Sequence, residues 1–221
     1  MHIILQQVRR NKMVKRLMIA AVVALLVCVP AQAVDWAVYG LQGPEPEHNN
    51  TFDNVFGVEV QPRFGEGPLK PWLSVGVSQW DAEDYDVTTG WWIFKERTQI
   101  SGNVQDLSFG GGVLYEIPIS DNIKLVSQGG VKYHLMNSDV EMKVTNRKGT
   151  TVSELDYDDA TTVEAGANLE IAIAENIDLL LGAAYMWDLN HDHVKSGGNK
   201  LALSNGLEGI VFRAGLVILT P

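Results

Sequence analysis

The chain is short of cysteine, of long apolar runs and, after its first segment, of basic residues. Its single cysteine, Cys28, lies within the first 33 residues, so no disulfide is expected to hold the rest of the chain together. After that segment no apolar run approaches the length of about 18 residues that a helix needs to cross a membrane. A helical membrane protein and a disulfide-stapled secreted domain are both excluded.

The first 33 residues have the three parts of a secretory signal. A basic stretch precedes an apolar run from Leu17 to Val29, and the small-residue motif Ala31-Gln32-Ala33 follows. That apolar run is shorter than the roughly 20 residues of a membrane-spanning helix. We therefore predict a signal peptide over residues 1–33, with Met13 as an alternative start, and one mature domain over residues 34–221.

The predicted mature domain is acidic. The five basic residues before Ala33 leave with the signal, so 12 of the 17 basic residues remain beside 27 acidic ones, a formal charge of −15. Nucleic-acid binding depends on lysine and arginine contacts to phosphates. This charge excludes a nucleic-acid partner.

Long runs of alternating apolar and polar residues dominate the mature domain. Alternation with a period of two is typical of β-strands that have one apolar face. For example, Leu107, Phe109 and Val113 share one phase, while Asp106 and Ser108 share the other. Eight such runs occur: they begin near residues 34, 56, 72, 106, 123, 162, 177 and 208.

The connections between the runs alternate between short and long. Short turns fall near 65–68, 118–122 and 175–176, and long polar connections near 43–51, 81–104, 137–160 and 190–205. Short turns at one end and long loops at the other are typical of an outer-membrane barrel. The third long connection alternates again around Asn146-Arg147-Lys148-Gly149, which predicts a hairpin that extends past the barrel.

Alternation does not say which face of the strands points outward. A soluble lipocalin-like barrel would place its apolar face inside, around a ligand. Two features favour the opposite arrangement: the runs often reach 12 to 14 residues, and glycines such as Gly110, Gly112 and Gly130 crowd the polar phase. Glycine weakens a strand on a water-facing surface, but inside a narrow barrel it makes room for larger side chains. We therefore predict an all-β fold, an eight-stranded antiparallel up-and-down transmembrane β-barrel.

Aromatic residues gather toward the ends of the runs. Trp and Tyr are enriched where a barrel meets the two membrane–water interfaces. We expect interface positions for Trp36, Tyr39, Trp72, Trp80, Tyr115, Tyr133, Tyr185 and Trp187.

The chain has a predicted signal peptide, eight alternating runs, three short turns and four long loops. In this combination it resembles the OmpA-type family of small outer-membrane barrels, and the resemblance covers the whole mature domain. The resemblance implies insertion into outer-membrane lipid by the outer-membrane insertion machinery, which reads the final strand. Arg213-Ala214-Gly215-Leu216-Val217-Ile218 is similar to that signal. Some barrels of this architecture modify lipid A with a His and a Ser close together on a lipid-facing strand. Here His134 falls on the inward phase, and Ser138 lies four positions on.

The polar phase carries the candidate functional residues. Charges inside a narrow barrel must be paired or hydrated, because isolated burial costs several kcal/mol. Breaking one pair could open a narrow ion path. The predicted lumen network contains Glu59, Arg63, Asp106, Glu116, Lys132, His134, Glu164, Glu170 and Arg213, and the same phase carries Lys124, Asp178, Asp188 and Glu208.

Two features of the long loops have alternative explanations. Asn190-His191-Asp192-His193 could hold a divalent metal, but two histidines this close in a loop are more often simply solvated. Trp91-Trp92 could contact lipid headgroups or a partner, or pack inside its own loop. We expect no cofactor, no metal site and no catalytic residue.

The leading hypothesis is a non-enzymatic outer-membrane barrel with a structural or surface-interaction role and at most a narrow, gated conductance. An unknown extracellular partner would bind the long loops. The alternatives are an outer-membrane lipid A-modifying acyl hydrolase or transferase and a periplasmic lipocalin-like carrier.

Overall fold

The computed structural model describes residues 34–43, 56–89, 96–189, 194–196, 199–201 and 207–220. These residues form β-strands and turns, and no helix among them is long and apolar enough to cross a membrane. The predicted signal peptide lies outside the described residues. The strands are β1 (Val34–Gln42), β2 (Phe56–Phe64), β3 (Leu69–Thr89), β4 (Glu96–Ser120), β5 (Ile123–Asn146), β6 (Gly149–Tyr157), β7 (Ala160–Ala174), β8 (Ile177–Asp188), β9 (Val194–Ser196), β10 (Asn199–Leu201) and β11 (Gly209–Ile218).

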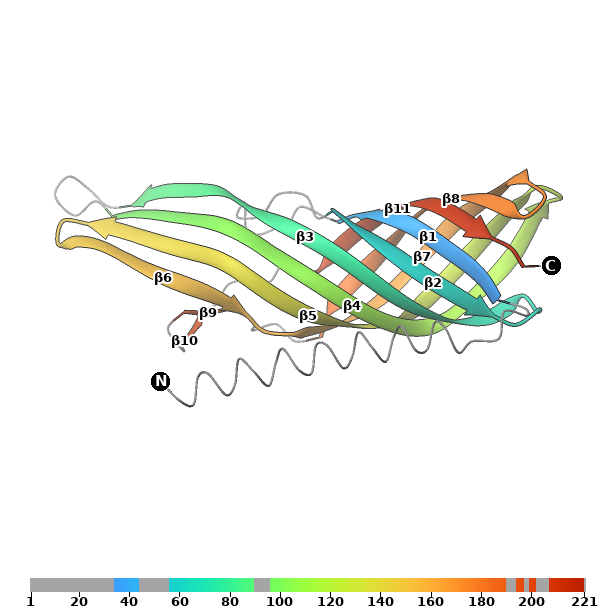
Figure 1. The fold of residues 1–221 in the computed structure, drawn as a ribbon, viewed down its shortest axis with the longest axis horizontal. Helices are drawn as coiled ribbons and strands as arrows, with labels where there is room; N and C mark the ends of the chain where they lie inside the picture. The colour runs from blue at the N-terminus through green and yellow to red at the C-terminus, as the bar shows by residue number, and fades with distance from the viewer. Residues whose placement is uncertain are drawn as a thin grey trace.

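Eight of these strands form a closed antiparallel ring. In order around the ring they are β1, β2, β3, β4, β5, β7, β8 and β11, and β11 pairs with β1 to close it. The predicted eight-stranded up-and-down barrel is confirmed. In Figure 1 the barrel occupies the right half of the molecule, and the three short turns lie at the same end as the C-terminus.

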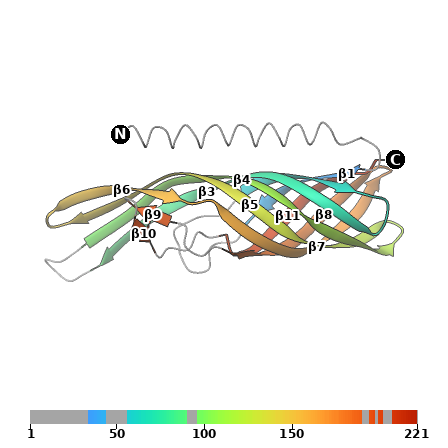
Figure 2. The same ribbon diagram turned by 90° about the horizontal axis from the view of Figure 1, so that it is seen from below.

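Strands β3, β4 and β5 continue far beyond the barrel at the opposite end. They form, with β6, a curved sheet that we call the extension, and the β9–β10 hairpin adds to its β6 edge (Figures 1 and 2). β5 serves both parts, because Ile123–His134 pairs with β7 and Val140–Asn146 pairs with β6. The predicted hairpin around residues 147–148 is therefore confirmed.

Most of the connection that we expected as a loop over 81–104 belongs to the paired strands β3 and β4. β3 runs to Thr89 and β4 begins at Glu96, with their register shifted between Ala82 and Tyr85. Gly102 lies at this irregularity with φ +131°. An added Cβ there would lie 2.0 Å from the carbonyl oxygen of Asp139, so the position requires glycine.

The apolar phase of the barrel strands faces outward. Large side chains such as Val113, Phe212 and Leu181 are exposed on the outer surface of the ring. The opposite phase faces the lumen and is buried, as at Glu59, Ser74 and Gln128. This arrangement is the reverse of a soluble barrel, whose apolar side chains lie inside.

The outward apolar surface ends where the strands leave the barrel. On β4 it includes Ile117 to Leu107, and Ile119 at the short turn is also exposed. Beyond Leu107 the outward positions Gln105 and Asn103 are polar. About ten residues at roughly 3.4 Å rise per residue, tilted by about 40°, span about 25 Å along the barrel axis. This height matches the apolar band of an outer-membrane barrel.

Candidate functional site: the barrel lumen

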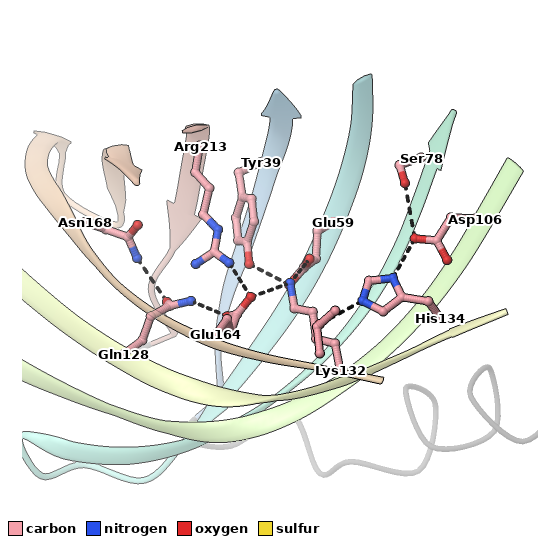
Figure 3. A network of polar contacts seen from close by, with 11 residues as sticks. Tyr39, Glu59, Ser78, Asp106, Gln128, Lys132, His134, Glu164, Asn168 and Arg213 are labelled. Atoms are coloured by element: carbon pink, nitrogen blue, oxygen red, sulfur yellow. Dashed lines mark hydrogen bonds and ion pairs between the residues drawn. The ribbon is translucent and has the colours of Figure 1, made fainter. Parts of the chain in front are cut away.

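The centre of the lumen holds a network of two carboxylates and two cations. Glu164 of β7 accepts hydrogen bonds from Arg213 Nη2 at 2.6 Å and from Lys132 Nζ at 3.0 Å. Lys132 also pairs with Glu59, which accepts a hydrogen bond from the Tyr39 hydroxyl at 2.7 Å (Figure 3). The four formal charges sum to zero, so the central network is neutral.

The alternation of the strands brings these side chains together. Each of the four charged residues belongs to the inward phase of a different strand, β2, β5, β7 or β11. Each side chain is at least 97% buried. Gln128 donates to Glu164, and Asn168 donates to Gln128, each at 3.0 Å. The guanidinium of Arg213 also lies 5.4 Å from the ring centroid of Tyr39.

Two further sets of ion pairs lie toward the short-turn end. Arg63 donates to Glu170 at 2.6 Å, and Lys124 bridges Glu170 and Asp178 at 3.5 and 2.9 Å. Closer to the first residues of β1 and β3, Lys70 bridges Asp35 and Glu116 at 2.7 and 3.1 Å. Sequence reasoning missed Lys70 and Asp35, although Lys70 shares the phase of Ser74 and Gly76 and could have been included on that ground.

A fourth polar cluster lies toward the extension. The Nδ1 atom of His134 lies 2.9 Å from Asp106 Oδ2, and its Nε2 atom lies 3.0 Å from the hydroxyl of Thr162. The Ser78 hydroxyl donates to the same Asp106 oxygen at 3.2 Å. Thr162 and Ser78 are not in the predicted lumen network, although both share the inward phase of their strands.

All nine residues of the predicted lumen network therefore lie on the inward face, and each acidic member contacts a basic side chain. Glu208, which we had also placed on that phase, is exposed and accepts a hydrogen bond from the outward-facing Tyr185. That assignment is wrong, because Glu208 shares the phase of Ile210 and Phe212, which faces outward, and not the phase of Arg213.

Two of the expected interface aromatics lie in the lumen instead. Trp72 is 1% exposed and packs with Leu114 and Val126, while Tyr39 is 2% exposed and bonds Glu59. The interface assignment is wrong for both, because their positions belong to the inward phase of β3 and β1. Trp72 alternates in step with Ser74 and Gly76, a signal already present in the sequence.

The other expected interface aromatics whose side chains the structure describes lie on outward positions. Tyr115, Tyr133 and Trp187 are exposed, and Tyr185 packs against Trp187 with ring centroids 4.7 Å apart. Trp36 is half-buried on the outward phase of β1. The side chain of Trp80 lies outside the part that the structure describes.

Three glycines of the inward phase on β4 and β5 make room for Trp72 and Lys132. An added Cβ on Gly130 would lie 2.4 Å from Cζ2 of Trp72, and one on Gly112 would lie 2.8 Å from the same atom. Gly110 similarly adjoins Lys132, whose Cγ would lie 2.7 Å away. This packing explains why glycine gathers on the polar phase of β4 and β5.

Within the described ranges, no group of three or more His, Cys, Asp or Glu side chains could hold a metal ion. The predicted metal ligands at 190–193 and the pair Trp91-Trp92 lie outside those ranges. The lumen can thus hold charge in paired form, but the described side chains form no ligand set for a metal.

No family model and no curated protein matches this chain. Among solved structures, it is similar to a major outer membrane protein from Thermus thermophilus, with a TM-score of 0.50, 14% identity, and coverage of 85% of this chain and 99% of that one. It is also similar to Neisserial surface protein A, with a TM-score of 0.45, 11% identity and coverage of 85% and 96%. Ail, the attachment invasion locus protein of Yersinia pestis, has a TM-score of 0.40, 12% identity and coverage of 84% and 95%.

At identities this low, the likeness concerns the fold alone. The ring of eight antiparallel strands, the short turns at one end and the Thermus structure agree on that fold. The chain therefore has the fold of the small outer-membrane β-barrels, as its resemblance to the OmpA-type family implies.

Proposed function

We propose that the chain is an integral outer-membrane protein with a structural or surface-interaction role, and that its lumen supports at most a narrow, gated conductance. The main support for this proposal is the arrangement of the barrel, which has exposed apolar side chains outside and paired charges inside. Outer-membrane lipid would cover the outer face, and the insertion machinery would place the barrel there. An extracellular partner would meet the extension, which stands beyond the apolar band.

The lumen suits a gate better than an open pore. Side chains fill an eight-stranded barrel, and here Lys132 and Arg213 both bind the one carboxylate of Glu164. A passage through the centre requires at least one of these pairs to exchange its partner. Planar-bilayer recording should show small and infrequent openings, whereas a steady large conductance would contradict a closed lumen.

Cell fractionation tests the membrane location directly. The mature protein should be recovered in the outer-membrane fraction and should migrate faster on a detergent gel before boiling than after it. Recovery of the protein in the soluble periplasmic fraction would contradict the proposal and would favour the alternative of a lipocalin-like carrier.

We also propose that the chain is not an enzyme. Asp106, His134 and Thr162 form an acid–imidazole–hydroxyl chain, which is the order of groups that nucleophilic catalysis uses. However, all three side chains are at most 5% exposed and face the lumen rather than lipid. Incubation with lipopolysaccharide followed by mass spectrometry should show no loss or gain of acyl chains, and a changed acyl count would support the lipid A-modifying alternative.

A further inference from the structure

The polar and apolar faces of the strands are interchanged where the strands leave the barrel. Within the barrel, the inward positions of β4 and β5 include the polar residues Asp106 and His134. In the extension, the same phase continues with the apolar residues Val104 and Ile100 on β4, and with Met136 and Val140 on β5. The outward phase changes the other way and becomes polar, for example at Asp139.

These apolar side chains join a cluster that crosses the mouth of the barrel. Its members are Ile100, Val104, Met136, Val140, Leu155, Tyr157, Ala160 and Leu207, with Met142 packed against them. Leu207 lies two residues before β11, and β11 is the fourth neighbour of β4 in either direction around the ring of eight. The cluster therefore connects opposite walls of the barrel.

The cluster is buried, and its side chains carry few polar atoms that could bind an ion. None of its eight core side chains is more than 7% exposed. Ser138, on the same phase, donates its hydroxyl to the carbonyl oxygen of Leu155 at 3.0 Å and accepts from the Tyr157 N–H at 3.2 Å. Burial also raises the pKa of the Tyr157 hydroxyl above its usual range, so this side chain stays neutral.

We propose that this cluster, which we call the apolar cap, is a second gate that closes the extracellular end of the lumen in series with the central charge network. The inference rests on the proposed membrane barrel and adds where its lumen is closed. Apolar constrictions exclude ions because water and charge are costly to place in them. Rearrangement of the central ion pairs alone would then leave the lumen closed to the outside.

Thiol accessibility tests the apolar cap without depending on conductance. Ser108 is buried in the lumen on β4, four residues from Val104 toward the short-turn end, and residues 34–221 contain no native cysteine. The Ser108→Cys protein, refolded in detergent, is treated with a small cationic methanethiosulfonate reagent, and its labelling rate is measured by mass spectrometry. Asp139→Cys, on the exposed outer face of the extension, gives the rate for a freely accessible thiol.

The cap variants are Leu207→Ser and Val140→Ser, each combined with Ser108→Cys. The matched control is Val152→Ser, which makes the same kind of change at a side chain 55% exposed on the extension. With the cap intact, the thiol introduced at position 108 should react at least about tenfold more slowly than the thiol introduced at position 139. Each cap variant should accelerate the reaction at position 108 severalfold, while the control does not.

Each outcome decides the inference. Rapid labelling at position 108 with the cap intact, or equal rates in the cap variants and the control, would overturn it. The faster migration of the unboiled protein on a gel reports folding in every variant. If the gel shift persists while the labelling pattern fails, the cap is wrong and the barrel stands. If the shift is absent even without cap substitutions, the membrane barrel itself is contradicted.

Discussion

The glycines and the tryptophan of the lumen form one packing unit. Gly110, Gly112 and Gly130 are neighbours on β4 and β5, and the indole of Trp72 lies over them. The polar phase predicts that these glycines lie inside the barrel. The position of Trp72 near the end of its run favours a membrane interface, but its phase is the same inward one. The alternation was the better guide.

Gly130→Ala should destabilise the barrel by about 1–3 kcal/mol, because the new methyl group has no room beside Trp72 or beside the carbonyl oxygen of Gly111. Its neighbour provides the control. In Gly129→Ala the nearest atom to the added Cβ is 3.5 Å away, so stability should change by less than about 0.5 kcal/mol. Urea titration in lipid vesicles, followed by tryptophan fluorescence, measures both; equal effects would contradict the packing described.

Removing one partner of a central ion pair should lower the unfolding free energy, because the other charge is then left buried without its partner. Arg213→Gln leaves Glu164 with Lys132 and Gln128 as partners, and we expect a loss of about 3 kcal/mol in unfolding free energy. Adding Glu164→Gln should recover part of that loss, because the remaining carboxylate charge is removed with its partner. Lys143→Gln, at an exposed position on the extension, is the control and should change little. Additive effects of the two lumen variants would show that Arg213 and Glu164 are not coupled.

The partners of each lumen charge could not be read from the sequence. Alternation assigns a residue to a face, but the pairing across the lumen depends on how the strands are staggered around the ring. Arg63 and Glu170 are 107 positions apart and meet because β2 and β7 face each other across the lumen. Periodicity therefore predicts the members of the network and not its contacts.

At the scale of whole elements, the eight barrel strands were predictable because each one alternates clearly. The parts of β3 and β4 that lie in the extension were not predictable in this way. On β4 the apolar residues of this part are sparse, change to the inward face and are interrupted by the irregularity at Gly102. A segment with polar residues on its outward face and few apolar ones on the other face resembles a loop until its neighbour β5 is seen beside it.

Gly102→Val should loosen the extension and leave the barrel intact. A valine at φ +131° is strained, and its side chain would meet the backbone of Asp139 and Val140. Amide hydrogen exchange should accelerate at 96–104 and 137–146 while amides at 107–117 and 123–133 keep their protection. Ser101→Val, at the exposed neighbouring position, should change neither segment. Equal acceleration in both regions would show that the extension and the barrel unfold as one unit.

At the scale of the molecule, two surfaces of opposite character meet at the barrel rim. The barrel is apolar outside and charged inside, and the extension is polar outside and apolar inside. Each part therefore presents to its surroundings the side chains that suit them: lipid around the barrel, water around the extension. The same change places an apolar core directly over the end of the lumen.

The orientation of the two faces is the central claim, and nitroxide labels can measure it in bilayers. Single cysteines are placed outward at Val113, Val131 and Leu181 and inward at Ser74, Ser108 and Gln128, and their collision rates with oxygen and with a water-soluble nickel complex are compared. The outward labels should favour oxygen, which concentrates in lipid, while the inward labels should collide little with either. Outward labels that collide mainly with nickel, or inward labels that favour oxygen, would contradict the account.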